Sequence, residues 1–116
     1  MKHISEMDVH ILAEKLSDMI WYDFDSWPQK AQSTIGYQVI KSSDSISANL
    51  SEGYGRYTPA DRKRFYYFSR GSLEETKTWL NKAARRQIVY FNRMIEYNSI
   101  LNELGPQLNG FMNATH

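Results

Sequence analysis

The sequence predicts an all-α protein, an antiparallel up-down-up-down four-helix bundle. Apolar residues recur at three- and four-residue steps along most of the chain, which is the period of a helix with one buried face. The interruptions in this pattern are short, and short connections between helices favour antiparallel neighbours. The 116 residues suit one domain that spans residues 1–116.

The first helix is expected over residues 6–22. Ser5 is its expected N-cap, with Asp8 three residues later as a weak form of the capping box. One face of this helix is expected to be buried, because it carries a stripe of apolar residues. The stripe consists of Val9, Leu12, Leu16, Met19 and Ile20.

The second helix is expected over residues 27–52, with Ser26 as its N-cap. Gly36 inside this helix costs about 1 kcal/mol relative to alanine, which indicates a close contact with another helix. Gly53 and Gly55 are expected in the left-handed conformation that ends many helices.

The third helix, over residues 59–86, has the clearest start in the sequence. Thr58 supplies a capping hydroxyl, Pro59 occupies the first helical position and Asp61 places a carboxylate near the positive end of the helix dipole. The fourth helix is expected over residues 92–113.

Two segments interrupt the helical pattern in the last third of the chain. Residues 88–91 are apolar and are expected to fold onto the bundle as a connection. Gly105 and Pro106 predict a kink or a break in the fourth helix, because proline removes one backbone hydrogen bond and clashes with the preceding turn.

Composition excludes several classes of protein. The chain has no cysteine, so it has neither disulfides nor thiolate metal sites. The N-terminal residues lack the apolar segment of a signal peptide, and no apolar run approaches the roughly 20 residues that span a bilayer. A cytoplasmic protein without a membrane partner is therefore expected.

Charge is segregated along the chain although the net charge is only +1. Residues 54–93 hold ten Lys or Arg against three Asp or Glu, a net charge of +7. Residues 1–53 have a net charge of −4, and residues 94–116 have a net charge of −2. A basic face can attract nucleic acid, whereas opposed faces can also attract other copies of the same protein.

The candidate nucleic-acid-binding residues are the basic residues of this central segment. Tyrosines interleave the cations at positions 54, 57, 66 and 67, and aromatic rings can stack on bases while cations hold phosphates. The alternative is a solvated face or an electrostatic contact between subunits. The candidate residues are Arg56, Arg62, Lys63, Arg64, Arg85 and Arg86.

A second set of polar residues is expected to join the second and third helices structurally. Glu52 and Arg56 are four residues apart, as are Arg70 and Glu74, and this spacing places each pair on one helix face. We expect one polar network across the two helices. Its members would be Asn49, Glu52, Arg70, Ser72 and Glu74.

No motif in the sequence indicates catalysis, a metal or a cofactor. The histidines at positions 3, 10 and 116 are not part of the Glu-x-x-His pairs that a diiron bundle needs. Gly53 and Gly55 precede Arg56 as in a phosphate loop, but no strand precedes them and no Gly-Lys-Ser/Thr follows. A protein that is not an enzyme is expected.

The central segment resembles a known bacterial family. The matching residues are Ser45-Ile46-x-x-Asn49-Leu50-x-Glu52-Gly53-x-Gly55-Arg56, followed by Phe65-x-x-Phe68-Ser69-Arg70-Gly71-Ser72-Leu73-Glu74-Glu75. This pattern is similar to that of the four-helix bundle proteins associated with intervening sequences of 23S ribosomal RNA genes. The departures from the usual family residues are Ser47, Leu50, Ser51, Ser69 and Thr76.

The resemblance implies a fold, an assembly and partners. It implies an antiparallel four-helix bundle that forms a homopentamer. It also implies relatedness to the accessory variability proteins of diversity-generating retroelements, which bind RNA and a reverse transcriptase through a basic surface. RNA binding, and by analogy a reverse transcriptase partner, follow for this chain from the resemblance.

Two hypotheses for function remain open at this point. The first is an oligomeric bundle that binds structured RNA through its basic surface. The second is a protein–protein scaffold in which the basic segment of one copy meets the acidic segment of another, with no nucleic acid involved.

Overall fold

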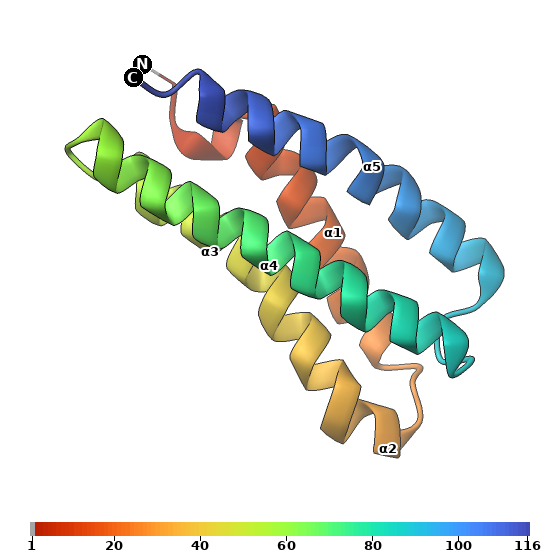
Figure 1. The fold of residues 1–116 in the computed structure, drawn as a ribbon. Coiled ribbons are helices and arrows are strands. Elements are labelled where there is room, and N and C mark those ends of the chain that lie inside the picture. The colour runs from red at the N-terminus through yellow and green to blue at the C-terminus, as the bar shows by residue number, and fades with distance from the viewer. Residues whose placement is uncertain (1) are drawn as a thin grey trace.

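The computed structural model describes residues 2–116 and confirms the predicted all-α fold. The four long helices are α1 (Asp8–Phe24), α3 (Tyr37–Tyr54), α4 (Pro59–Arg85) and α5 (Phe91–Asn113). Three short elements complete the chain: η1 (Ile4–Glu6) before α1, and α2 (Gln29–Ala31) followed by η2 (Gln32–Gly36) before α3. Figure 1 shows the long helices as one elongated bundle.

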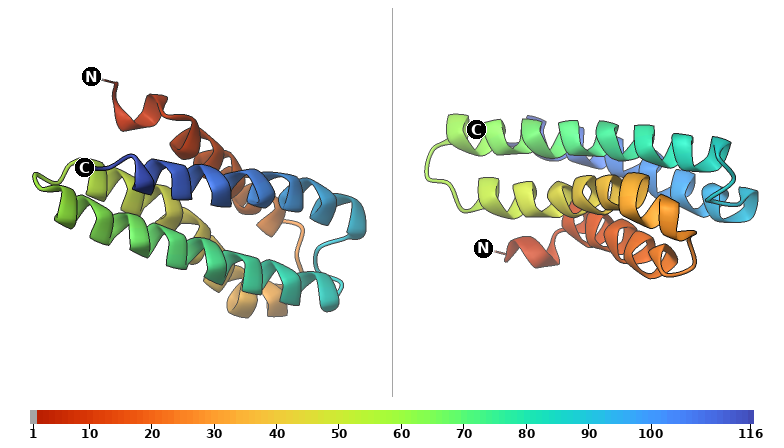
Figure 2. Two further views of the ribbon diagram at one scale, coloured as in Figure 1. Left: turned by 45° about the horizontal axis from the view of Figure 1, so that its top comes forward. Right: turned by 90° about the horizontal axis from the view of Figure 1, so that it is seen from below.

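Each long helix packs against two others, so the four close around one core. α3 contacts α1 and α4, and α5 contacts the same two helices. The bundle measures 44 × 24 × 20 Å, and Figure 2 shows it from two further sides. None of the helices in residues 2–116 has both the length and the hydrophobicity to cross a bilayer. The largest aliphatic side chains that are fully buried are Leu16, Ile20, Val39, Ile46, Leu50, Leu73, Leu80, Leu104 and Leu108.

The starts of the first two predicted helices differ from expectation. α1 begins at Asp8 after the short turn η1, and His3 rather than Ser5 accepts the capping hydrogen bond of that turn. Ser26 does not cap the second helix, because its hydroxyl donates to the carbonyl of Asp23. The chain runs extended through Pro28 before α2 begins, since that residue has ψ 148°.

The segment between α2 and α3 is a π-helix, which the sequence pattern did not predict. In η2 the hydroxyl of Thr34 donates to the carbonyl of Lys30 at 2.6 Å, and such hydrogen bonds bend helices. Gly36 ends this segment in close contact with α1. A Cβ at Gly36 would lie 2.6 Å from a ring carbon of Phe24, so the predicted close helix contact is confirmed.

The two glycines at the end of α3 are not left-handed, so that prediction was wrong. Neither has a positive φ, and Gly55 follows the helix with φ −82° and ψ −5°. Gly53 lies inside α3 and lets α4 approach closely. A Cβ there would lie 2.7 Å from the ring of Tyr66 and 2.9 Å from the carbonyl oxygen of Arg62.

α4 begins as predicted. The Thr58 hydroxyl accepts a hydrogen bond from the amide of Asp61 at 3.2 Å, and Pro59 is the first helical residue. α5 does not break at Pro106, because the helix continues to Asn113. Pro106 lies on an exposed face, where water can reach the carbonyl that loses its helical partner.

The connection between α4 and α5 folds onto the bundle only in part. Val89 is buried, as expected. Tyr90 and Phe91 instead point outward, with 73% and 82% of their surfaces exposed. Gln87 makes the turn with a positive φ of 60°.

A polar cluster ties the end of α1 to the start of α5. Arg93 donates two hydrogen bonds, of 2.6 and 3.0 Å, to the carboxylate of Asp23. The hydroxyl of Tyr97, whose side chain is fully buried, donates to the same carboxylate. Burial and this hydrogen bond raise the pKa of Tyr97 well above its ordinary value.

Candidate nucleic-acid interface

The first basic group lies at the turn between α3 and α4. Arg62 donates from its Nε to the carbonyl of Arg56 at 2.7 Å, which fixes the turn. The guanidinium of Arg56 lies 4.5 Å from the centre of the Phe65 ring, and that of Arg64 lies 5.0 Å from it. The sequence candidates Arg56 and Arg64 therefore share one aromatic ring, and Arg62 is tied to Arg56 at the same turn, next to Lys63 in the chain.

Carboxylates neutralise part of this group. Arg56 pairs with Glu52 at 2.6 Å, as its four-residue spacing predicted, and it lies 3.7 Å from Asp61. Arg64 pairs with Asp61 at 3.0 Å. Two of the four cations at this turn are thus already engaged by carboxylates, which lowers the charge available for phosphates.

The second basic group lies at the opposite end of α4. The helix rises about 1.5 Å per residue, so Arg85 and Arg86 are about 35 Å from Arg62. The six sequence candidates therefore form two groups at the two ends of the bundle and not one patch. Arg85 and Arg86 are both exposed.

Most cations of α4 have no acidic partner. Between residues 59 and 86 there are eight lysines and arginines, and only Arg64 and Lys77 form ion pairs. The other six have no carboxylate within 4.0 Å in the part of the chain that the structure describes. These unpaired cations of α4 are Arg62, Lys63, Arg70, Lys82, Arg85 and Arg86.

Only half of the interleaved tyrosines can meet a ligand. Tyr57 and Tyr67 have 95% and 53% of their surfaces exposed. Tyr66 is fully buried, and burial raises its pKa. Tyr54 stacks on Phe111, and its hydroxyl donates to the carbonyl of Lys2.

The predicted polar network across α3 and α4 is not formed. Glu52 pairs with Arg56 rather than across helices, and Asn49 donates to the carbonyl of Ser45 in its own helix. Arg70 and Glu74 do not pair, because Arg70 lies over the ring of Tyr67 and Glu74 binds Lys77. Ser72 contributes only its carbonyl, which accepts from Thr76.

Small hydroxyl residues join α3 and α4 instead. Ser69 donates to the carbonyl of Ile46 at 2.7 Å. Thr76 approaches the Ser42 hydroxyl at 2.9 Å, and all three hydroxyl residues are buried. Ser69 and Thr76 therefore join α3 and α4 through buried hydrogen bonds.

The histidines and carboxylates of residues 2–116 form no cluster of three or more that could hold a metal ion. His10 is nearly buried between α1 and α3, where its Nε2 lies 3.1 Å from the Ser51 hydroxyl. The same nitrogen lies 3.7 Å from Glu14. His10 thus joins the two helices.

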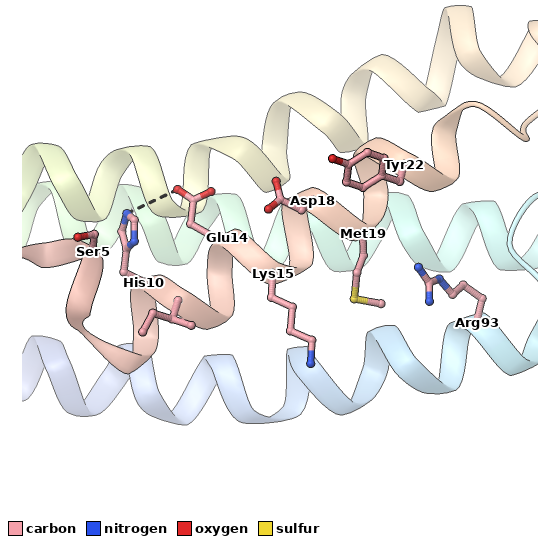
Figure 3. A pocket seen from close by; sticks show the side chains of 9 residues that line it. Ser5, His10, Glu14, Lys15, Asp18, Met19, Tyr22 and Arg93 are labelled. Atoms are coloured by element: carbon pink, nitrogen blue, oxygen red, sulfur yellow. Dashed lines mark ion pairs between the residues drawn. The ribbon is translucent and has the colours of Figure 1, made fainter.

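The acidic face lies on α1 and the adjoining part of α3. Figure 3 shows a shallow hollow along α1, with Glu14 and Asp18 on the side towards α3 and Lys15 towards α5. Burial, and then the charges of Glu14 and Asp18, raise the pKa of Asp44 on α3. Three of the eight acidic residues in residues 1–53, namely Glu14, Asp18 and Asp44, therefore lie near one another on these two helices.

The structure also adds residues to the second basic group that sequence analysis did not select. Lys30, Lys82, Tyr37 and Trp79 line hollows beside Arg86. Trp79, Lys82 and Arg86 are spaced i, i+3 and i+7, which places them on one face of α4. This spacing is the feature of the sequence from which Trp79 and Lys82 could have been assigned to the same group as Arg86.

Fold and charge together define a small all-α bundle protein whose longest helix carries unpaired cations at both ends. The chain belongs to the 23S rRNA-intervening sequence protein family, whose model matches residues 5–110. The resemblance noted from residues 45–75 is thereby confirmed. A comparison with curated proteins found no match.

Proposed function

We propose that this chain is a non-enzymatic bundle protein that binds structured RNA through the unpaired cations of α4. The observation that carries this proposal is the lack of acidic partners for six of the eight cations between residues 59 and 86. Cations that are not neutralised within the protein can release counterions from a phosphate backbone, which is the main source of affinity for nucleic acid.

The family supports RNA as the nucleic acid. Its name refers to intervening sequences of 23S rRNA, which is a structured RNA.

Assembly is part of the proposal. In the expected homopentamer, the basic ends of five α4 helices would be repeated around one axis and would bind one RNA at several points. A reverse transcriptase is a partner by analogy only. The alternative function is a scaffold in which the acidic face of α1 meets the basic turn of a neighbouring copy.

Binding of a labelled RNA hairpin at increasing salt tests the proposal. If about three phosphates are contacted, the logarithm of the binding constant should fall with the logarithm of salt concentration with a slope of about −2 to −3. A slope near zero would exclude a phosphate-driven complex.

Reversing the charge of the cations at the α3–α4 turn tests whether this turn is part of the RNA-binding surface. Replacing Arg62, Lys63 and Arg64 by glutamate should weaken RNA binding at least tenfold. The matched control reverses Lys15 and Lys41, which are exposed on the acidic half of the molecule. Equal affinity of the triple variant and the wild type would remove this turn from the interface.

A further inference from the structure

Two adjoining hollows flank Arg86, between the α2–η2 segment and the end of α4. One, of about 310 Å³, lies between Lys30, Ile35 and Ile88. The other, of about 370 Å³, lies between Tyr37, Trp79 and Lys82. Thr34, Ile35 and Arg86 line both hollows. Each is at the lower end of the roughly 300–1,000 Å³ of ligand pockets, which suits a group the size of one nucleotide.

The cations around these hollows are available to an anion. Lys30, Lys82 and Arg86 have no carboxylate within 4.0 Å among residues 2–116. Lys82 lies 5.4 Å from the centre of the Trp79 ring, which holds its ammonium group over the indole. The site thus combines positive charge with aromatic walls.

The aromatic residues offer both a stacking surface and an unused donor. Tyr37 has 63% of its surface exposed and is supported on one side by Phe24, with ring centres 5.9 Å apart. The indole N–H of Trp79 is buried without a hydrogen-bond partner among residues 2–116. A buried N–H without an acceptor is unfavourable, so an acceptor that reached this N–H would be stabilised by it.

The π-helix η2 contributes side chains to the walls of both hollows. Its extra residue per turn changes the direction in which Thr34 and Ile35 project, and π-helical turns are frequent at functional sites. Figure 1 shows that α3 crosses α4 and that its α2 end lies apart from the end of α4. The side chains of Trp79, Lys82 and Arg86 line the hollow in the seam that this divergence leaves.

We propose that the seam between η2 and the last two turns of α4 binds one unpaired nucleotide of an RNA strand. The base stacks on the exposed ring of Tyr37 and supplies an acceptor to the Trp79 indole N–H. The adjoining phosphates lie against Lys82 and Arg86, and Lys30 lines the neighbouring hollow of about 310 Å³. This proposal rests on the proposed RNA binding and adds a selectivity for unpaired nucleotides.

The test compares two fluorescently labelled probes, a single-stranded oligouridine of about eight nucleotides and a blunt RNA duplex. Tyr37→Leu keeps an apolar contact with Phe24 but removes the stacking ring. It should weaken oligouridine binding at least fivefold and leave duplex binding unchanged. Tyr37→Phe keeps the ring and should restore wild-type affinity, which separates stacking from folding.

Two further variants test the phosphate contact and the indole. Arg86→Gln should lower the salt slope for oligouridine by about 0.7. Oligouridine should change the tryptophan fluorescence of the wild type, and Trp79→Phe should abolish that change. The matched controls are Tyr22→Leu and Lys15→Gln on α1, both outside the proposed RNA surface.

The outcomes separate the two proposals. Salt-dependent binding of RNA that is unaffected by Tyr37→Leu and Arg86→Gln would overturn the nucleotide site and leave RNA binding at the α3–α4 turn in place. Absence of binding for both probes at low salt would overturn both proposals. Equal loss of affinity for duplex and oligouridine would overturn the base site, because a contact with phosphate alone does not distinguish the two probes.

Discussion

Asp23 joins α1 to α5 through hydrogen bonds with two residues of α5. It accepts from Arg93 and from the buried hydroxyl of Tyr97. These partners are 70 or more positions further along the chain, so one carboxylate joins the two ends of the sequence. Asp23 is the acceptor for the Tyr97 hydroxyl, whereas Arg93 also donates to Glu96.

Asp23→Ala should therefore lower the free energy of unfolding by about 1–3 kcal/mol, because it leaves the buried hydroxyl of Tyr97 without its acceptor, while Arg93 keeps its ion pair with Glu96. Urea unfolding measures the loss. Asp25→Ala is the matched control, since Asp25 is exposed and forms no ion pair among the described residues. Similar losses for both variants would contradict a specific cluster at Asp23.

Asp44 makes the stability of the protein depend on pH. Its raised pKa means that the folded state binds the proton more tightly than the unfolded chain does, because of burial and of Glu14 and Asp18. The ionised group therefore destabilises the fold at neutral pH, and the penalty disappears as the pH falls below its unfolded pKa of about 3.9.

Asp44→Asn should raise the melting temperature at pH 7, and the gain should vanish near pH 3. Thermal unfolding followed by circular dichroism across this range checks the sign. Asp8→Asn should show no such gain. Asp8 lies in the first turn of α1, where its negative charge interacts favourably with the helix dipole. A gain for Asp44→Asn that persisted at pH 3 would contradict the electrostatic cause.

At the scale of elements, the contact between α3 and α4 depends on small residues. Gly53 meets the ring of Tyr66 and the backbone of α4, while Ser42, Ser69 and Thr76 supply hydroxyls between the helices. Small residues allow helices to approach closely, and the buried hydroxyls remain hydrogen-bonded. The outer side of the same α4 has Gly71, where an added Cβ would have nothing within 4 Å.

Alanine at the two glycines should act in opposite directions. Gly53→Ala forces its Cβ against backbone and ring atoms, so the free energy of unfolding should fall by about 1–3 kcal/mol. Gly71→Ala adds only helix propensity and should raise it by up to about 1 kcal/mol. Chemical denaturation of each variant measures its change in the free energy of unfolding. A neutral Gly53→Ala would mean that α4 can shift away without cost.

At the scale of the molecule, exposed aromatic residues and divided charge favour self-association. Trp21, Tyr22, Tyr90 and Phe91 are each more than half exposed. The acidic face on α1 is complementary to the basic turn before α4. Contacts of this kind are typical of subunit interfaces, where aromatic residues and arginine are enriched.

Light scattering should therefore give a multiple of the 13.6 kDa chain mass, with five chains expected. If opposed charges hold the subunits, the assembly should dissociate as salt increases. A monomer mass at micromolar concentration and low salt would contradict self-assembly. A salt-resistant oligomer would instead point to the exposed aromatic residues.

The features that could be predicted from the sequence are those that depend on residues close to one another in the chain. Helical periodicity identified four helices, and Thr58 with Pro59 located the start of α4 to the residue. Capping and side-chain spacing act within one turn, as the Glu52–Arg56 pair also shows. The prediction from neighbouring residues was wrong for Ser26, because its hydroxyl donates to the carbonyl of Asp23 in the preceding turn. It was also wrong for Gly53, which lies inside α3 and allows α4 to approach closely.

The all-α class, the family and the concentration of positive charge in residues 54–93 could be predicted from the chain, because period, motif and charge are properties of neighbouring residues. Packing was needed to show which cations are neutralised, that the candidates form two groups, and that Tyr37 and Trp79 adjoin Arg86. Close helix contacts and hollows join residues that are far apart in sequence, so neighbouring residues carry no signal of which of them meet.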